Sequence, residues 1–316
     1  MWAGNSPRMA DGSPPVTRVL QLPLTMADFS RRGFRLDRES ERAELEKHAR
    51  YFLTGFNVAA KSRYVHSALA EIPDAERGFA YEGAGMFAAL HDLAALGRGG
   101  ALARLLSGPG DDYTHLIHVG HGWALVPTRL PLPVAVPATP LLRWLALDGA
   151  GFAETYFGGL RALWRRCHRR PSEHRQARIA GCGRALWFTQ AADPVGVARV
   201  IARMPESARG PLWSGIGLAA CYAGCAGPGA VAELVRSSGP YAPHFGQGVL
   251  FAGAARYRAR IVPEHTGRVC EQLFSATPEE ISWWTDEAAH GLTGSTELSA
   301  YTEWKARLRE LAERRF

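Results

Sequence analysis

The stretch VGHGWALV, residues 119–126, places two glycines two positions apart inside an otherwise apolar run. The same Gly-x-Gly pattern recurs as EGAGMFAA (82–89), VGHGWALV (119–126), DGAGFAET (148–155), AGCGRALW (180–187), SGIGLAAC (214–221) and FGQGVLFA (245–252). The first glycines are separated by 37, 29, 32, 34 and 31 residues and are Gly83, Gly120, Gly149, Gly181, Gly215 and Gly246. A near-constant period of about 33 residues indicates repeats of one supersecondary unit.

The residues around these glycines favour helices. Alanine stands four positions beyond the first glycine in four copies, and four beyond the second glycine in the other two. Small residues one helical turn apart let two helix backbones approach closely. A glycine inside a helix costs up to about 1 kcal/mol relative to alanine. Six repetitions of that cost indicate that close packing requires the glycines.

The segments between the copies predict short second helices. In the C-terminal half, Asp193 can cap a helix whose first residue is Pro194. Thr277 and Glu280 have the spacing of a capping box at another helix start. Each unit therefore combines a longer glycine-bearing helix with a shorter amphipathic one. We expect an all-α fold of about six helical-hairpin repeats, arranged as a solenoid or a closed α/α toroid.

The remaining segments define the expected organisation. Residues 38–65 predict one long N-terminal helix, with Leu45, His48, Phe52 and Phe56 near one face. Residues 1–17 are expected to form a disordered tail, and 18–316 a single domain. The stretch 127–140 contains five prolines and predicts an extended crossing segment rather than a helix.

The composition excludes several classes of protein. No run of about 18 apolar residues predicts a membrane span, and the N-terminus lacks the apolar core of a secretory signal. Five cysteines without a CxxC pair are typical of free thiols in a reducing compartment. We therefore expect a cytoplasmic protein.

The formal charge of +7 is concentrated in residues 161–178, which hold seven arginines and two histidines. This segment has two interpretations. It can be an anion-binding surface for a phosphate, a nucleic acid or an acidic protein such as an acyl carrier protein. Alternatively, it is a solvated linker in an arginine-rich chain. No nucleic-acid recognition motif accompanies the charge, so we expect no nucleic-acid partner.

Two cofactor interpretations of the Gly-x-Gly copies fail. A dinucleotide loop requires GxGxxG between a strand and a helix, and six copies are too many for one cofactor. The histidines at 115, 118 and 121 invite a metal site, but the first and last are about 240° apart around a helix. We expect neither a metal nor a cofactor. His118 and His121 remain candidates for lining a cavity.

Two acids beside the glycines are candidates for chemistry. Glu82 and Asp148 each precede a glycine in an apolar run, where a carboxyl group must be hydrogen-bonded or take a raised pKa. They are candidate general acids, or they satisfy buried backbone or arginine groups. Other polar and aromatic residues near the glycine helices are candidates for lining a cavity, or for the core: Tyr81, Trp123, Glu154, Tyr156, Trp187 and Tyr222.

Four blocks of the chain carry a family resemblance. RGFAYEGAGM (77–86), LLRWLALDGAGFAETYF (141–157), GRALWF (183–188) and GLAACYAG (217–224) are similar to the shared blocks of an uncharacterised family, number 1702 of the domain-of-unknown-function series. The resemblance extends from about residue 31 to residue 262. It implies a role in bacterial secondary metabolism, notably in gene clusters for enediyne polyketides, and carries no catalytic residues over.

Together, the resemblance and the residues predict a biosynthetic protein. We expect it to bind a hydrophobic, polyunsaturated intermediate and to promote its cyclisation or isomerisation, including a terpenoid-type cyclisation, with Glu82 and Asp148 as acid and base. The alternative is a non-catalytic helical-repeat adaptor. It would dock an acyl carrier protein or a synthase through Arg165, Arg166, Arg169 and Arg170.

Overall fold

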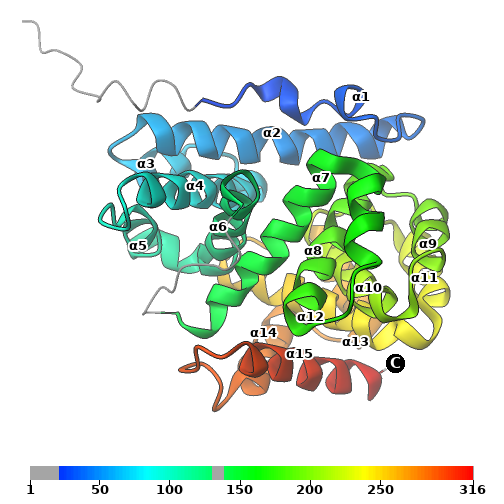
Figure 1. Cartoon of the computed structure of the whole chain (residues 1–316). Coiled ribbons are helices and arrows are strands. Elements are labelled where there is room, and N and C mark those ends of the chain that lie inside the picture. The colour runs from blue at the N-terminus through cyan, green and yellow to red at the C-terminus, as the bar shows by residue number, and fades with distance from the viewer. Residues whose placement is uncertain (1–20, 130–138, 316) are drawn as a thin grey trace, which may run out of the picture.

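The computed structural model describes residues 21–129 and 139–315, and every regular element in these ranges is a helix (Figure 1). The α-helices are α1 (Phe29–Arg32), α2 (Glu39–Lys61), α3 (Val65–Ala70), α4 (Asp74–Ala94), α5 (Ala101–Leu105), α6 (Thr114–Thr128), α7 (Leu145–Cys167), α8 (Glu173–Thr189), α9 (Pro194–Ala202), α10 (Glu206–Tyr222), α11 (Pro228–Ser238), α12 (Ala242–Arg258), α13 (Glu264–Phe274), α14 (Pro278–Ala289) and α15 (Leu298–Glu313). Short 3-10 helices are η2 (Leu24–Ala27), η3 (Gly108–Tyr113), η4 (Leu141–Trp144) and η5 (Gly239–Tyr241). The predicted all-α class is confirmed. In the described ranges, no helix is both long and apolar enough to cross a membrane.

The Gly-x-Gly copies lie in α4, α6, α7, α8, α10 and α12, and each of these helices packs against the next. The first glycine of a copy contacts the preceding helix: a methyl group added at Gly120 would overlap the backbone carbonyl of Glu82. The second glycine contacts the following helix, since a methyl group at Gly122 would overlap the carbonyl of Ala146. The same rule holds through α7, α8 and α10.

The spacing of two residues explains this double contact. Positions i and i+2 are about 200° apart around an α-helix, so the two glycines open opposite sides. Each helix can therefore be approached at backbone distance by two neighbours. In the last copy the second glycine contacts the preceding helix, since a methyl group added at Gly248 would overlap the carbonyl of Ser214 in α10. Ala252 stands four residues beyond Gly248, just as an alanine stands four residues beyond the first glycine in the copies of α6, α7, α8 and α10.

The predicted second helices are present in the C-terminal half. Helices α8, α10 and α12 are followed by the shorter α9, α11 and α13. The side chain of Asp193 caps α9 by accepting from the backbone N–H groups of Val195 and Gly196. Thr277 and Glu280 form a capping box at the start of α14. The described part of the N-terminal half is less regular. A solenoid or closed-ring arrangement of six repeats stays a prediction.

Two predicted boundaries change. The long N-terminal helix ends at Lys61, and α3 begins at Val65 after a break. Helix α6 continues through Pro127 to Thr128, so the proline-rich stretch is not extended from its beginning. One proline removes a single helical hydrogen bond, and the buried residues that precede it hold the turn. Most of that stretch, and the predicted tail 1–17, lie outside the described residues.

A kink divides α7. Gly159 has φ 59° and ψ −161°, a conformation essentially restricted to glycine. The part before the kink carries the Gly-x-Gly copy, and the part after it begins the arginine-rich segment 161–178. At the C-terminus, α15 packs against α8, α12 and α14. These two features place a basic segment at the surface and close one side of the glycine helices.

Candidate active site

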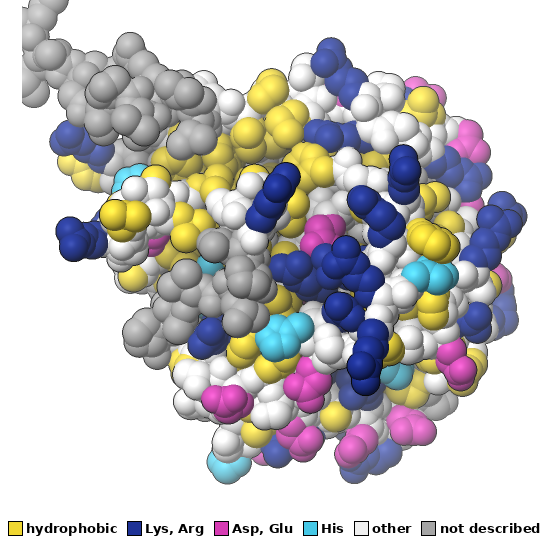
Figure 2. Space-filling view, in the orientation of Figure 1, with side chains coloured by type: hydrophobic (Ala, Val, Ile, Leu, Met, Phe, Trp, Pro, Cys, Tyr) yellow, Lys and Arg dark blue, Asp and Glu magenta, His cyan; other side chains and the backbone are white. Residues whose placement is uncertain are grey.

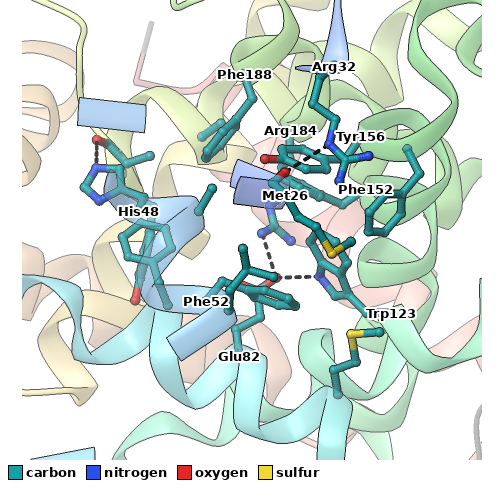
Figure 3. A pocket seen from close by; sticks show the side chains of 18 of the residues that line it. Met26, Arg32, His48, Phe52, Glu82, Trp123, Phe152, Tyr156, Arg184 and Phe188 are labelled. Carbon is teal, nitrogen blue, oxygen red and sulfur yellow. Dashed lines mark hydrogen bonds and ion pairs between the residues drawn. The ribbon is translucent and has the colours of Figure 1, made fainter. Parts of the chain in front are cut away.

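A cavity of about 50 Å³ lies between the glycine helices and the N-terminal elements (Figure 3). This volume has room for a few water molecules. Its lining residues come from the segment before η2, from η2 and α1, and from α2, α4, α6, α7, α8 and α10, with Ala223 just beyond α10; they are Leu22, Met26, Arg32, His48, Ala49, Phe52, Leu53, Phe79, Glu82, Met86, Trp123, Phe152, Tyr156, Phe157, Arg184, Phe188, Leu218, Ala219, Tyr222 and Ala223. We call this the aromatic cavity. Most of its wall is apolar, with Glu82 and Arg184 as buried charged groups.

Glu82 is held by two donors (Figure 3). Its Oε1 accepts a hydrogen bond of 2.9 Å from Trp123 Nε1 and a longer one of 3.4 Å from Arg184 Nη2. Arg184 also donates through Nη1 to Asp148 Oδ1. All four side chains are buried. The predicted acids Glu82 and Asp148 are therefore connected through one arginine.

The charge balance of this cluster favours a protonated Glu82. Two ionised acids beside one guanidinium would leave a net negative charge in the protein interior, which is unfavourable. Burial raises the pKa of Glu82, although Arg184 and Trp123 act in the opposite direction. With Asp148 paired to Arg184, protonation of Glu82 makes the cluster neutral. Burial thus favours the neutral form of Glu82 beside the aromatic cavity.

Aromatic rings surround this carboxyl group. The ring of Trp123 lies 4.3 Å from that of Phe52 and 5.0 Å from that of Phe152, measured between centroids. Phe152 also contacts Tyr156 and Phe188. Aromatic faces attract cations, and Arg184 already lies 5.0 Å from the Phe152 ring centre. Such a wall can bind an unsaturated chain and stabilise positive charge that develops on it.

The aromatic cavity reaches the surface near Phe157, whose exposed fraction is 42%. The Arg32 guanidinium lies 4.9 Å from the Phe157 ring centre and 5.4 Å from that of Tyr156. Arg32 also donates from Nε to the carbonyl of Met26. The N-terminal elements η2 and α1 therefore cover this side of the cavity.

Asp148 faces a different cavity. A space of about 60 Å³, which we call the inner cavity, is lined by Asp148 and by parts of α6, α7, α8, α10, α12 and α15. Arg184, Leu218 and Tyr222 line both cavities and separate them. Glu82 and Asp148 thus lie on opposite sides of Arg184. Glu82 therefore faces the aromatic cavity, and Asp148 pairs with Arg184 on the side of the inner cavity.

Several residues predicted to bind substrate line the aromatic cavity. Trp123, Tyr156 and Tyr222 do so together with Glu82. The Tyr156 hydroxyl has no hydrogen-bond partner among the described residues. Tyr222 packs its ring 3.8 Å from the Arg256 guanidinium. These side chains come from four glycine helices and meet because those helices pack in sequence.

Three other candidates lie elsewhere. Tyr81 stacks on the ring of Tyr113 at 4.1 Å in a separate core cluster. Trp187 is fully buried and donates to the carbonyl of Gly224. Glu154 forms ion pairs with Arg166 and with another arginine of the basic segment, at the surface. None of the three lines the aromatic cavity.

Of the histidines of α6, His118 and His121 are buried and His115 is half-buried, and none of them lines the aromatic cavity. His118 pairs with the Thr139 hydroxyl at 2.6 Å. Burial lowers the pKa of His118 to about 3 and that of His121 to about 4, so both are neutral at pH 7. His115 lines the inner cavity, and burial lowers its pKa to about 3. They fill the space around α6 as neutral polar groups.

Some residues of the cavity wall were not predicted from the sequence. Phe79, Phe188 and Met86 lie close to the glycines, but apolar residues at helical spacing give no signal of a cavity. Phe52 and His48 belong to the apolar face predicted for the first long helix. Their approach to the glycine helices depends on tertiary packing.

One cluster has the donors for a metal ion. Ligand atoms of Glu44, His48 and Glu76 all lie within 4.8 Å of one another. Lys47 Nζ, however, lies 3.2 Å from Glu76, and His48 donates from Nε2 to the carbonyl of Ala223. Burial alone would raise the pKa of Glu76, but His48 and Lys47 lower it below its ordinary value. The cluster is satisfied as an ion-pair network joining α2, α4 and the end of α10.

Comparison with known proteins gives one match. A family model described as a protein of unknown function (DUF1702) matches residues 16–312, which is nearly the whole chain. No curated protein and no solved structure matches the chain significantly. The match includes every residue of the aromatic cavity and of the inner cavity.

Proposed function

We propose a function for this protein, which belongs to the DUF1702 family. It binds a hydrophobic, polyunsaturated intermediate and promotes its cyclisation or isomerisation by proton transfer from Glu82. The observation that carries the proposal is a buried carboxyl group with a raised pKa, next to a cavity walled by aromatic rings. The resemblance noted in the sequence supports secondary metabolism as the setting. The reaction needs no cofactor.

The chemistry follows from the neighbours of Glu82. Its O–H bond breaks as a C–H bond forms at an alkene carbon of the ligand, which leaves a carbocation and a carboxylate. Arg184 and Trp123 stabilise the carboxylate, because both already donate to Oε1. The faces of Phe52, Phe152 and Tyr156 stabilise the carbocation. Ring closure or double-bond migration ends when a carbon returns a proton to Glu82.

The ligand requires more room than the cavity of about 50 Å³ offers. Sites for small organic molecules usually measure about 300 Å³ or more. Two methionines, Met26 and Met86, line the space, and their unbranched side chains adapt readily. Displacement of Arg32 from the rings of Tyr156 and Phe157 would widen the opening. We therefore propose that the ligand enters by moving η2 and α1.

The substrate can be identified by deleting the gene in its host and determining which metabolite accumulates. Incubation of purified protein with that metabolite in D₂O should place one deuterium on a carbon of the product. Glu82→Gln should remove the incorporation by more than about 100-fold, the usual scale of a lost general acid. Glu154→Gln is a matched control, since this acid lies outside the aromatic cavity.

A folded Glu82→Gln variant that forms the product at the normal rate would refute proton transfer from Glu82. Asp148→Asn should reduce the rate less than Glu82→Gln, because Asp148 acts through Arg184 and does not line the aromatic cavity. Circular dichroism and thermal unfolding check that each variant is folded.

One surface favours the alternative function, that of a non-catalytic adaptor. Beyond the kink of α7, the large hydrophobic residues Leu160 and Trp164 have exposed fractions of 42% and 53%. Arg165 and Arg169 are exposed beside them, as is Arg170. Lysine and arginine side chains gather at the middle of the face seen in Figure 2. This combination fits an acidic partner such as an acyl carrier protein.

Arg166 does not belong to that exposed set, because it is paired with Glu154. We expect Arg165→Glu with Arg169→Glu to weaken binding of an acyl carrier protein at least about tenfold, measured by fluorescence anisotropy. Reversal of Arg236 and Arg268, which are exposed on other helices, is the control. Equal affinity of both double variants would refute docking at this surface.

A further inference from the structure

A second site lies on the other side of Arg184 from the aromatic cavity. An outer pocket of about 540 Å³ is formed by the beginnings of α8 and α10, by α12 and by α15. Four residues line both this outer pocket and the inner cavity: Ser214, Gln247, Tyr301 and Lys305. The two spaces therefore adjoin at these side chains.

Buried polar groups at this boundary lack partners. Gln247 has no exposed surface, and neither atom of its side-chain amide has a hydrogen-bond partner among the described residues. His244 Nδ1, in the outer pocket, also has no hydrogen-bond partner among the described residues. A buried amide without hydrogen bonds is costly, on the order of 1–3 kcal/mol. Such groups are typical of sites that a polar ligand completes.

Two cations lie beside Gln247. Lys305 and Arg309 are one turn apart on α15, and both line the outer pocket. Lys305 is only 8% exposed, and within the described ranges no carboxylate lies within ion-pair distance of it. Burial lowers the pKa of Lys305 to about 8; the charge of Asp148 acts in the opposite direction and that of Arg309 in the same direction. An anion would relieve this unpaired positive charge.

The other charged and titratable groups around Lys305 do not neutralise it. Asp148 is bound to Arg184. Burial, Arg309 and Lys305 lower the pKa of His244 to about 4, so this ring is uncharged. Tyr301 presents its ring, 5.6 Å from Lys305 Nζ. Glu173 and Glu206 line the outer pocket as its acids, and both are exposed.

The inner cavity, by contrast, is largely apolar beyond Lys305. Its wall includes Leu116, Val119, Leu145, Leu218 and Phe251. The site therefore has a polar, positively charged outer part and an apolar inner part. This gradient matches a molecule with a charged head and a hydrocarbon chain.

We infer that the outer pocket binds the anionic head group of an amphipathic small molecule, a carboxylate or a phosphate. Lys305 and Arg309 contact the anion, the Gln247 amide donates to it, and the first carbons of its chain enter the inner cavity. The inference does not rest on the proposed function, because it concerns different residues and a different opening.

The test uses three ten-carbon probes with the full-length protein, titrated by calorimetry at pH 7: decanoate, decyl phosphate and the uncharged decanol. Both anions should bind at least about tenfold more tightly than decanol. The anion that binds more tightly shows whether the head group is a carboxylate or a phosphate. Lys305→Met should remove this preference, and Arg314→Met, an exposed arginine at the end of α15, should leave it intact.

Binding should also take up protons. At pH 8.5 much of the free Lys305 is neutral, and a bound anion raises its pKa, so the protein gains a proton that calorimetry in two buffers detects. Gln247→Leu should weaken the binding of both anions several-fold, because it removes the buried amide that donates to the head group. Equal binding of decanol and the anions, or unchanged anion binding by a folded Lys305→Met variant, would overturn the inference.

Discussion

At the scale of single residues, Arg184 decides the charge state of the interior. It lies between Glu82 in α4 and Asp148 in α7, and each acid faces a different cavity. Arg184 donates to both acids, and burial raises the pKa of Glu82 above its ordinary value. This difference separates Glu82, the proposed proton donor, from Asp148, although the two acids occupy equivalent places beside their glycines.

Replacement of Arg184 by methionine should therefore be strongly destabilising. The variant leaves Glu82 and Asp148 buried without a cation, and loss of one partner from such a pair costs about 3–5 kcal/mol. Urea unfolding at pH 7 measures the free energy of unfolding. Addition of Glu82→Gln and Asp148→Asn should restore part of the loss, because it removes the unpaired acids. If the triple variant is no more stable than Arg184→Met, the charge argument is wrong.

Lys305 should show the opposite behaviour. Its pKa is lower in the folded protein than the ordinary value of 10.5, so folding disfavours its charged form. The resulting loss of stability is complete below about pH 8 and disappears as pH rises towards 10.5. Lys305→Met should thus stabilise the protein at pH 7, by at most about 3 kcal/mol. The gain in unfolding free energy should shrink between pH 8 and pH 10, and a gain independent of pH would contradict the pKa argument.

At the scale of the elements, the Gly-x-Gly pattern acts on both sides of each helix. Gly120 admits the carbonyl of Glu82 from α4, and Gly122 admits that of Ala146 from α7. Two small residues at i and i+4 would open only one side. The pattern therefore encodes the order of packing as well as the helices, since each copy must meet the copy before it and the copy after it.

Glycine-to-alanine substitutions distinguish the effect of close helix packing from the effect of helix propensity on stability. Gly122→Ala should cost about 3 kcal/mol, because the new methyl group meets a backbone carbonyl that cannot rotate away. Gly267→Ala lies in α13 with no atom near the new methyl group, and should stabilise by up to about 1 kcal/mol. Thermal unfolding of both variants gives the comparison. Similar effects of the two would show that the Gly-x-Gly contacts are not needed.

At the scale of the whole molecule, the last glycine helix is tied to the first. Arg256 of α12 donates to the carbonyl of Ala75 in α4 at 2.9 Å and to that of Tyr222 in α10 at 2.6 Å. It is 2% exposed, and its guanidinium lies over the Tyr222 ring. This residue connects segments 181 positions apart in the chain. The wall of the aromatic cavity depends on that connection, because Tyr222 belongs to it.

Arg256→Met should accelerate amide hydrogen exchange in α4 and α12 together, since two carbonyls lose a charged donor. The expected destabilisation is about 3 kcal/mol, and Arg268→Met, an exposed arginine on α13, is the control. Faster exchange confined to α12 would mean that Arg256 does not couple the two helices. Mass spectrometry of peptides from both helices measures the outcome.

The helical class and the buried, glycine-bearing helices could be predicted from the sequence. Helical periodicity, caps such as Asp193 and the recurrence of Gly-x-Gly are local properties, and local properties can be read without a partner. The sequence also singled out Glu82 and Asp148 as candidates, because acids in apolar runs are unusual. It could not separate Tyr156 and Tyr222 from Tyr81 or Trp187, which look alike in the sequence.

The side that each residue faces depends on tertiary packing and could not be predicted from the sequence. A residue on a helix packed from two sides meets one of two neighbours, so Glu82 and Asp148, alike in sequence, open into different cavities. Lys305 and Gln247 gave no sequence signal, since a lysine in a polar helix is normally solvated. Their burial results from the packing of α15 against α12, which carries Gln247, and against α8, more than a hundred residues earlier in the chain. Contacts over such distances depend on the whole fold, and the chain near either residue does not encode them.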